Sequence, residues 1–198
     1  MIKRHRVLFA LLIILIFAAL ILLYEGMISD KACEAATLKA RQIVSESVSG
    51  AFADYMGENV DLSDALFSSS SVDAEKTLSI CAEVLADAER EIANDVAARL
   101  KAHSRVRVKI PSGSLSGIKY FSGKGIRLPF DAHLVSSVRS DPISSIESVG
   151  INHTLYRAKI KISVDCELIL NGKSELFSLE FEKTLAEKII IGEVPLAK

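Results

Sequence analysis

The first feature of the hydrophobic pattern is an unbroken apolar run at residues 7–24, eighteen residues with no charged side chain among them. A helix rises about 1.5 Å per residue, so this run matches the thickness of the hydrocarbon core of a bilayer. A buried helix of a globular domain is the alternative, but such a helix normally keeps a polar face, and this run has none. The pattern therefore predicts a transmembrane helix over residues 7–24.

The charges that flank this run give it an orientation. Three basic residues precede it, in the tail 1–6, whereas Glu25 and Asp30 follow it. Because Lys and Arg are held on the cytoplasmic side of a membrane helix, we expect a cytoplasmic basic tail at 1–6 and export of the remaining chain. A cleaved signal peptide is the alternative, but its apolar region is usually only about 7–15 residues long. Residues 33–35 (Cys-Glu-Ala) make a poor cleavage site, so we expect the anchor to be retained.

Two segments after the anchor show the helical period of three or four residues. In the first, Ser29 or Asp30 is expected to cap the helix and Gly57 to end it. In the second, the period begins near Val84, and His103 is expected to mark the end. The apolar stripe of the first helix is Ala40, Val44, Val48, Ala51 and Tyr55, and that of the second is Leu85, Ala88, Ile92, Val96 and Leu100.

Two short strands are expected between these helices. Residues 64–70 contain the only apolar cluster of a polar region, and residues 77–82 alternate polar and apolar side chains. A turn at 71–75 would pair them. A helix that begins at Asp73 is an alternative to the second strand, because the segment is rich in good helix formers.

A third strand follows the second helix. Residues 105–110 alternate strictly between charged and apolar side chains, and Pro111 should end the strand. The order helix, strand, strand, helix, strand predicts an αββαβ unit over residues 31–110. In this unit, two amphipathic helices would cover one face of a three-stranded sheet.

A Gly/Ser-rich loop is predicted at residues 111–125, which contain four glycines and four serines. A phosphate-binding loop is the alternative interpretation of such a composition. That interpretation needs a Lys-Ser/Thr ending and a following helix, and the segment has neither, so we expect a plain connection.

Residues 126–198 are predicted to be predominantly antiparallel β. Strands are expected at 132–139 and 144–149, with a break at Asp141-Pro142, and a closing strand at 187–192. The β half therefore contributes several strands in addition to the hairpin described next.

The strongest strand pattern lies at residues 158–183, where two alternating segments are joined by Asn171-Gly172. Asn-Gly is the preferred two-residue hairpin turn because both residues tolerate a positive φ. A two-residue turn also fixes the register, and every opposed pair on one face is then apolar. The predicted pairs are Cys166 with Phe177, Val164 with Leu179 and Ile162 with Phe181 on that face, and Lys161 with Glu182 on the other.

Together these elements predict an α+β fold with an N-terminal transmembrane helix, an αββαβ unit and a predominantly antiparallel β half. The formal net charge is −1, and the basic tail contributes +3, which leaves −4 on the remaining chain. This balance gives no electrostatic reason to expect nucleic acid as a partner. Three cysteines at wide spacings fit neither a disulfide framework nor a zinc site, so we expect them to pack as small apolar residues.

Candidate chemistry is sparse. A catalytic centre needs a nucleophile, a base and a group that orients the base. Cys166 falls on the predicted core face of a strand, and His103 is explained by its favourable place at a helix C-terminus. His133 and His153 lie near strand ends and could meet, but no motif links them to a carboxylate or a cysteine. The sequence therefore predicts no catalytic residue, no cofactor and no metal site.

Three segments carry a likeness to a known family. They are residues 108–117 (Val-Lys-Ile-Pro-Ser-Gly-Ser-Leu-Ser-Gly), residues 150–154 (Gly-Ile-Asn-His-Thr) before a long alternating strand, and residues 191–195 (Ile-Gly-Glu-Val-Pro). With the single N-terminal anchor, they resemble the YunB sporulation protein family of endospore-forming bacteria. The likeness covers most of the chain, and its specific residues lie after residue 105.

The resemblance implies a protein that is made in the mother cell early in engulfment and is needed for spore formation. Its folded part would face the space between the two forespore membranes, and no enzymatic activity or site residue comes with the family. The predicted order of elements at 31–110 is also similar to the ring-building motif of secretion-system inner rings and of the sporulation channel, which is a likeness of fold alone.

We therefore expect a membrane-anchored, non-enzymatic structural or interaction component of sporulation, placed in the outer forespore membrane of the mother cell. Its expected partners are the membrane, through residues 7–24, and either further copies of the chain or other sporulation membrane proteins. Self-association is expected to use the 31–110 unit, with the helix faces at Val48 and Ile92 as the positions to mutate.

Two other functional classes stay open. One is an extracytoplasmic enzyme that acts on cell wall or protein, which would need His133, His153 and an acidic residue in one cleft. The other is a β module that binds a small ligand or a lipid, which would need an apolar cavity within the C-terminal sheets.

Overall fold

The computed structural model describes the chain apart from residues 1, 73–74, 116–118, 151–152 and 192–198. Side chains are also outside the description at residues 2–14, 17–25, 27, 68–79, 119, 149–150 and 191. The chain divides into two compact units, each built from segments that are distant in sequence. The first unit comprises residues 1–40, 105–134 and 168–175, and the second unit comprises residues 41–104, 135–167 and 176–198.

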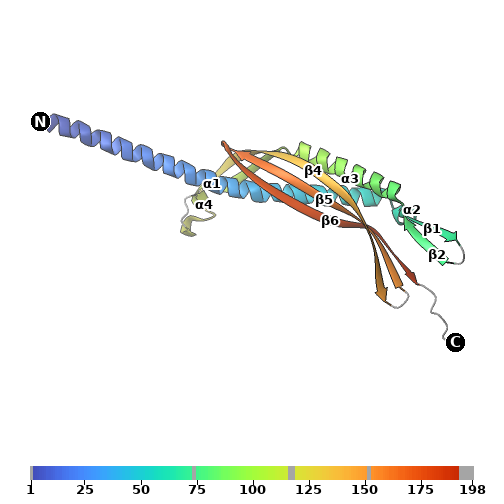
Figure 1. Cartoon of the computed structure of the whole chain (residues 1–198). Coiled ribbons are helices and arrows are strands. Elements are labelled where there is room, and N and C mark those ends of the chain that lie inside the picture. The colour runs from blue at the N-terminus through green and yellow to red at the C-terminus, as the bar shows by residue number, and fades with distance from the viewer. Residues whose placement is uncertain (1, 73–74, 116–118, 151–152, 192–198) are drawn as a thin grey trace. The chain divides into compact units, whose positions relative to one another are not determined.

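Helix α1 runs without a break from Ile2 to Glu58 (Figure 1). The prediction of a separate helix capped by Ser29 or Asp30 is therefore wrong. No proline interrupts the stretch, and a glycine such as Gly26 costs a helix only about 1 kcal/mol, so the helix formers on either side carry it through. The predicted end at Gly57 lies one residue before the observed end.

The apolar run at residues 7–24 lies inside α1, but nearly all of its side chains are outside the description. Among the residues that are described, no helix is both long enough and apolar enough to cross a membrane. The transmembrane helix therefore stays a prediction from the sequence.

Four strands form one antiparallel sheet in the order β3-β4-β5-β6. Strand β3 pairs with the beginning of β4, with Arg105 opposite His133 and Pro111 opposite Arg127. A short helix, α4, and a single 3-10 turn, η1, lie between these two strands. The bounds are Arg105–Pro111 for β3, Ser112–Leu115 for α4, Lys119–Phe121 for η1, Arg127–Gly150 for β4, His153–Leu170 for β5 and Lys173–Ile191 for β6.

A second, smaller sheet contains only two strands. Helix α2 (Leu62–Leu66) leads into β1 (Phe67–Val72), which pairs with β2 (Glu75–Ile80). The α+β class is confirmed, but the predicted three-stranded sheet is wrong, because β3 belongs to the four-stranded sheet. Alternation along a strand fixes which face is buried, and it does not select the neighbouring strand.

Two predicted strand breaks are absent. Strand β4 continues through Asp141 and Pro142, and β6 continues to Ile191 in place of a separate closing strand. The ladder between β3 and β4 ends at His133. Pro142 therefore lies where one edge of β4 is not paired with β3, and an edge tolerates the missing N–H of proline.

The predicted hairpin turn is confirmed. Strand β5 ends at Leu170, β6 begins at Lys173, and Asn171 and Gly172 have φ values of 50° and 78°. The predicted core face of β5 is buried at each of Ile162, Val164 and Cys166, which are at most 3% exposed.

The charged face of this hairpin differs from the prediction. Lys161 pairs with Glu180 at 3.0 Å in place of Glu182, and Glu182 pairs with Lys159 at 2.6 Å. Long lysine side chains reach the diagonal neighbour on the next strand as readily as the residue directly opposite.

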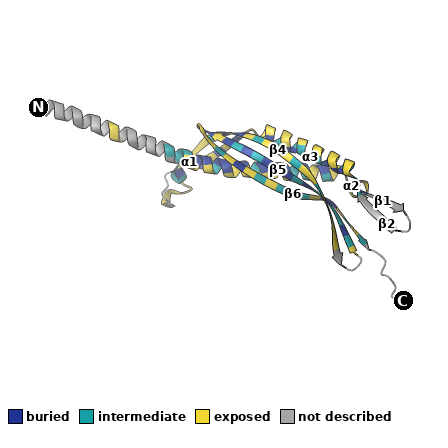
Figure 2. Ribbon diagram, viewed as in Figure 1, coloured by how far each residue is buried: buried dark blue, intermediate teal, exposed yellow. Residues whose placement is uncertain are grey.

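Helices α1 and α3 provide the other layer of the core. Helix α3 runs from Ala82 to Ala102, with His103 as its C-cap residue as predicted. Both predicted apolar stripes are buried, with no member more than 9% exposed (Figure 2). Val48 and Ile92 are 0% and 1% exposed, so they pack within the core and cannot be faces that bind a further copy.

In the second unit, both helices contact the sheet. The guanidinium of Arg41 on α1 lies 5.0 Å from the ring centre of Phe177 on β6, and Ser140 on β4 donates a hydrogen bond to Glu89 on α3. The segments of the second unit therefore form two layers, with α1 and α3 against one face of the sheet (Figure 1).

Candidate functional site

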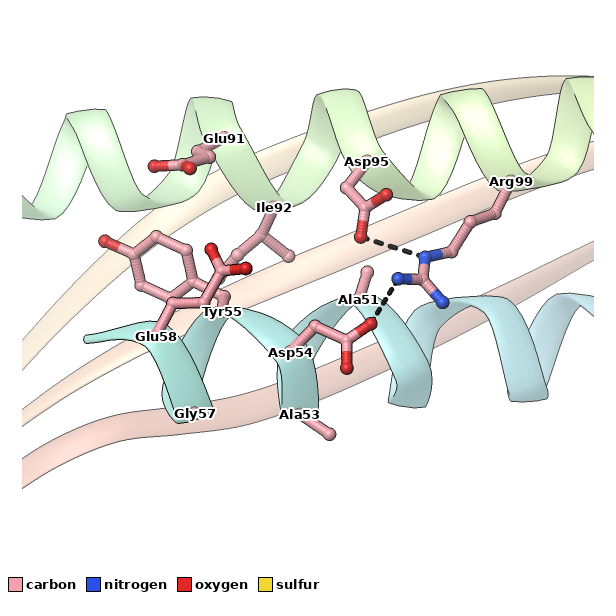
Figure 3. A pocket seen from close by; sticks show the side chains of 10 residues that line it. All are labelled: Ala51, Ala53, Asp54, Tyr55, Gly57, Glu58, Glu91, Ile92, Asp95 and Arg99. Atoms are coloured by element: carbon pink, nitrogen blue, oxygen red, sulfur yellow. Dashed lines mark hydrogen bonds and ion pairs between the residues drawn. The ribbon is translucent and has the colours of Figure 1, made fainter. Parts of the chain in front are cut away.

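A cleft of about 500 Å³ lies between the C-terminal part of α1 and α3, within the second unit. Five charged side chains line it, four acidic and one basic. Figure 3 shows its lining, which comprises Ala51, Ala53, Asp54, Tyr55, Gly57, Glu58, Glu91, Ile92, Asp95 and Arg99.

Arg99 bridges the two helices at one end of the cleft. Its Nε donates to Asp95 Oδ2 at 2.9 Å, one turn away on α3, and its guanidinium also pairs with Asp54 on α1 (Figure 3). These hydrogen bonds raise the pKa of Arg99, with the bond to Asp95 the larger cause. Gly50 leaves the space for this arrangement, since a Cβ there would lie 2.9 Å from Arg99 Nη1.

Tyr55 forms the floor at the other end of the cleft, below Glu91 (Figure 3). Its side chain is 9% exposed. Burial raises the pKa of the Tyr55 phenol, and the nearby charges of Glu91 and Asp87 add to the effect. The hydroxyl therefore stays protonated at neutral pH and is available as a hydrogen-bond donor.

The electrostatic character of the cleft is acidic. Four carboxylates line it, and Arg99 pairs with two of them, Asp54 and Asp95. Glu58 and Glu91 are exposed at the mouth. Such an arrangement favours a cationic group of a partner, whereas the lining holds no cysteine, serine or histidine that could act as a nucleophile with its base.

Cys33 and Cys166 are buried as predicted, whereas Cys81 is only half-buried. Cys166 is 3% exposed, and burial raises the pKa of its thiol to about 11, with Asp165 as a lesser cause. Burial also raises the pKa of Cys33, and a contact with Glu175 at 3.5 Å acts in the same direction. Both thiols are therefore protonated at neutral pH, and a protonated thiol is a poor nucleophile.

The three histidines whose side chains are described occupy separate settings. His103 Nδ1 lies 2.9 Å from the carbonyl oxygen of Arg99 at the end of α3. His133 is exposed on β4 opposite Arg105, and His153 is the exposed first residue of β5. A search of the described residues finds no group of three or more His, Cys, Asp or Glu that could hold a metal ion.

A second hollow of about 500 Å³ lies on the sheet within the second unit. Strands β4, β5 and β6 all contribute to it, and exposed Val135 and Leu176 give it an apolar character. It is open to solvent, in contrast with the enclosed cavity that a lipid-binding β module requires. Its lining comprises Val135, Ser136, Ser137, Asp165, Cys166, Glu167, Leu176, Phe177 and Ser178.

Sequence reasoning did not identify the α1–α3 cleft. Asp95 and Arg99 are four residues apart, which is the spacing of an ion pair within a helix. The sequence alone could therefore have predicted the contact between these two residues. The contact between Asp54 and Arg99 joins residues 45 positions apart and has no such signal.

Comparison with known proteins gives one match. Residues 107–197 match the family model described as Sporulation protein YunB (Spo_YunB). This confirms the resemblance over the C-terminal half of the chain. No curated protein and no solved structure shows significant similarity to the chain.

Proposed function

We propose, from the YunB-family region at residues 107–197, that this sporulation-related protein is a membrane-anchored, non-enzymatic interaction component with both folded units in the space between the forespore membranes. The observation that carries the proposal is the continuity of α1. One helix contains both the apolar run at 7–24 and the buried stripe from Ala40 to Tyr55. A fold built on its own anchor helix suits a component that must hold a partner at a fixed place on a membrane.

The acidic mouth of the α1–α3 cleft is the surface that we assign to a partner. Glu58 and Glu91 are exposed there, and the nearby Tyr55 is 9% exposed. A basic segment of another sporulation membrane protein would complement these charges. Further copies of the chain would have to use exposed surfaces of this kind, because Val48 and Ile92 are buried.

An enzymatic role finds less support in the described residues. The two buried thiols, Cys33 and Cys166, have raised pKa values, and the carboxylates Asp54 and Asp95 are engaged by Arg99. A general acid or base needs to be free to contact a substrate, and both of these carboxylates are occupied by ion pairs with Arg99.

The anchor can be tested on the full chain. Leu15→Arg combined with Ile16→Arg places two charges at the centre of the run 7–24, where each costs about 2.5–3.5 kcal/mol. Leu38→Arg is the matched control, because Leu38 is 65% exposed on the same helix beyond the run. We expect the double variant to leave the membrane on alkaline extraction and the control to stay. Release of the unmodified chain by the same wash would refute the anchor.

The role in sporulation is tested in a spore-forming host. Deletion of the gene for this chain should reduce the number of heat-resistant spores. Expression of the full chain should restore that number. The charge-reversed pair Glu58→Lys and Glu91→Lys should fail to restore it, whereas Glu46→Lys, exposed elsewhere on α1, should succeed. Full restoration by the cleft variant would exclude the cleft as the partner surface.

A further inference from the structure

The charge of the chain is distributed unevenly. Residues 105–130 contain six basic residues and no acidic one, whereas the whole chain carries a net charge of −1. On β3, Arg105, Arg107 and Lys109 are all exposed, and Arg127 on β4 is exposed beside them. We call these four residues the basic face. The neighbouring carboxylate of Asp131 is engaged by Arg107 at 2.6 and 3.1 Å, so the face keeps a net positive charge.

The loop that connects β3 to β4 exposes large apolar side chains. Tyr120, Phe121 and Ile126 are 75%, 47% and 77% exposed. The two aromatic rings meet edge to face with their centres 5.4 Å apart, and Lys124 Nζ lies 4.5 Å from the centre of the Tyr120 ring. We call residues 119–127 the aromatic loop. Aromatic rings beside lysine and arginine are the side chains that settle in the interface of a bilayer.

Backbone contacts hold the aromatic loop in one conformation. Ser112 N–H donates to the carbonyl of Ile126 at 2.8 Å, and Gly113 N–H donates to that of Lys124 at 2.9 Å. A Cβ at Gly113 would lie 2.0 Å from the carbonyl oxygen of Phe121, so only glycine permits this approach. Leu115, at the end of α4, is 1% exposed. The apolar side chains are therefore presented to solvent by an ordered backbone.

The aromatic loop and the basic face lie in the same compact unit as residues 1–40 of α1. Ala32 of α1, which is buried, follows the apolar run by eight residues, which is about 12 Å of helix. Within this unit, Asp30 of α1 also pairs with Lys173 at the start of β6. The first unit is thus built directly on the part of α1 that follows the predicted anchor.

We propose that the aromatic loop and the basic face bind the headgroup region of an anionic bilayer, the same bilayer that holds α1. The proposal rests on the anchoring proposed above. Tyr120, Phe121 and Ile126 enter the interface, while Lys124, Lys109 and Arg127 contact lipid phosphates. Apolar burial and attraction to anionic lipid act together at such a site, and each basic side chain strengthens binding about fivefold.

The chain contains no tryptophan, so a single introduced tryptophan reports its own environment. The test uses the full chain reconstituted into vesicles of phosphatidylcholine, with or without phosphatidylglycerol, in which some lipids carry bromine to quench fluorescence. Tyr120→Trp should emit at shorter wavelength and be quenched in the anionic vesicles. Val60→Trp, 81% exposed just beyond the end of α1, is the control and should stay unquenched.

Further substitutions in the Tyr120→Trp chain test which residues the lipid contact needs. Lys109→Gln with Arg127→Gln should reduce quenching, whereas Lys101→Gln, an exposed lysine of the second unit, should not. Gly113→Ala should also reduce quenching, because the added Cβ would force the backbone at Phe121 to move. Inorganic phosphate at millimolar concentration should leave the emission of the introduced tryptophan unchanged.

Three results would overturn the proposal. The first is an unquenched tryptophan in a Tyr120→Trp chain that resists alkaline extraction, since the anchor would then be intact and the loop free of lipid. The second is an emission that depends on protein concentration and not on lipid, which would indicate a second copy of the chain. The third is a change of emission on adding RNA or DNA without anionic lipid. Loss of the whole chain from the vesicles would instead refute the anchor.

Discussion

Thr37 on α1 donates a hydrogen bond of 2.6 Å to Glu175 on β6, although 138 residues separate the two in sequence. The Thr37 side chain is buried, with 5% of the residue exposed. Cys33, one helical turn earlier, lies 3.5 Å from the same carboxylate oxygen. Because a buried hydroxyl without an acceptor is costly, this contact fixes α1 to the start of β6 within the first unit.

Glu175→Ala should therefore lower the free energy of unfolding by about 1–3 kcal/mol, since the Thr37 hydroxyl would be left buried without its acceptor. Chemical denaturation of the full chain in detergent micelles measures this value. Glu175→Gln is the matched control, because an amide oxygen still accepts the hydrogen bond. This variant should lose less of the free energy of unfolding than Glu175→Ala. An equal loss in both variants would show that the negative charge matters and the hydrogen bond does not.

The pH dependence of stability should carry the signature of Cys166. Its thiol pKa is raised from 9.0 to about 11, mainly by burial. The unfolded chain would ionise this thiol near pH 9 while the folded chain keeps it protonated. The stabilisation is therefore complete below about pH 9 and is lost as the pH rises toward 11, at up to about 1.4 kcal/mol per pH unit.

Cys166→Ala removes this dependence, so the stability difference between the unmodified chain and the variant should shrink above pH 9. Denaturation curves at intervals from pH 7 to pH 11 measure it. Cys81→Ala, at a half-buried position, shows whether the loss of any thiol has the same effect. A difference that stays constant across this range would mean that Cys166 ionises in the folded chain as readily as in the unfolded one.

Arg99 should stabilise the packing of α3 on α1 in a salt-dependent manner. Arg99→Gln leaves Asp54, Asp95, Glu58 and Glu91 as unneutralised neighbours, so we expect a lower midpoint of thermal unfolding at low salt. The difference should narrow in 1 M salt, where charges are screened beyond about 3 Å. A double-mutant cycle with Asp54→Asn isolates the contact between the helices, and additive single effects would show that it contributes nothing.

The parts of this fold that were predictable have local signals. The stripes that contain Val48 and Ile92 follow the helical period and are buried, and Asn171-Gly172 forms the predicted turn. The strand before Pro111 was also found, but its partner was not. Arg107 pairs with Asp131, which lies 24 residues later in the sequence. The alternation of one strand does not indicate which other strand will lie beside it.

The same reasoning explains why the α1–α3 cleft and the aromatic loop were not found from the sequence. Asp54 meets Arg99 only because two helices pack together, and no periodicity encodes that meeting. The composition of residues 111–125 predicted only a plain connection, whereas the structure uses Gly113 for a close backbone approach to the loop. Glycine permits both outcomes, and the difference lies in long-range contacts.

The uninterrupted helix at Gly26 leads to the last prediction, which concerns how the anchor is joined to the fold. A Cβ at Gly26 would meet nothing within 4 Å, so Gly26→Ala should be tolerated and should favour the helix by about 0.5–1 kcal/mol. Gly26→Pro should break or kink α1 between the apolar run and Ala32, at a cost of about 3 kcal/mol. If a rigid connection is needed, the proline variant should stay in the membrane yet fail to restore heat-resistant spores, while the alanine variant restores them. Restoration by both variants would show that α1 serves only as a tether, because function would then survive the loss of a fixed orientation between the anchor and the fold.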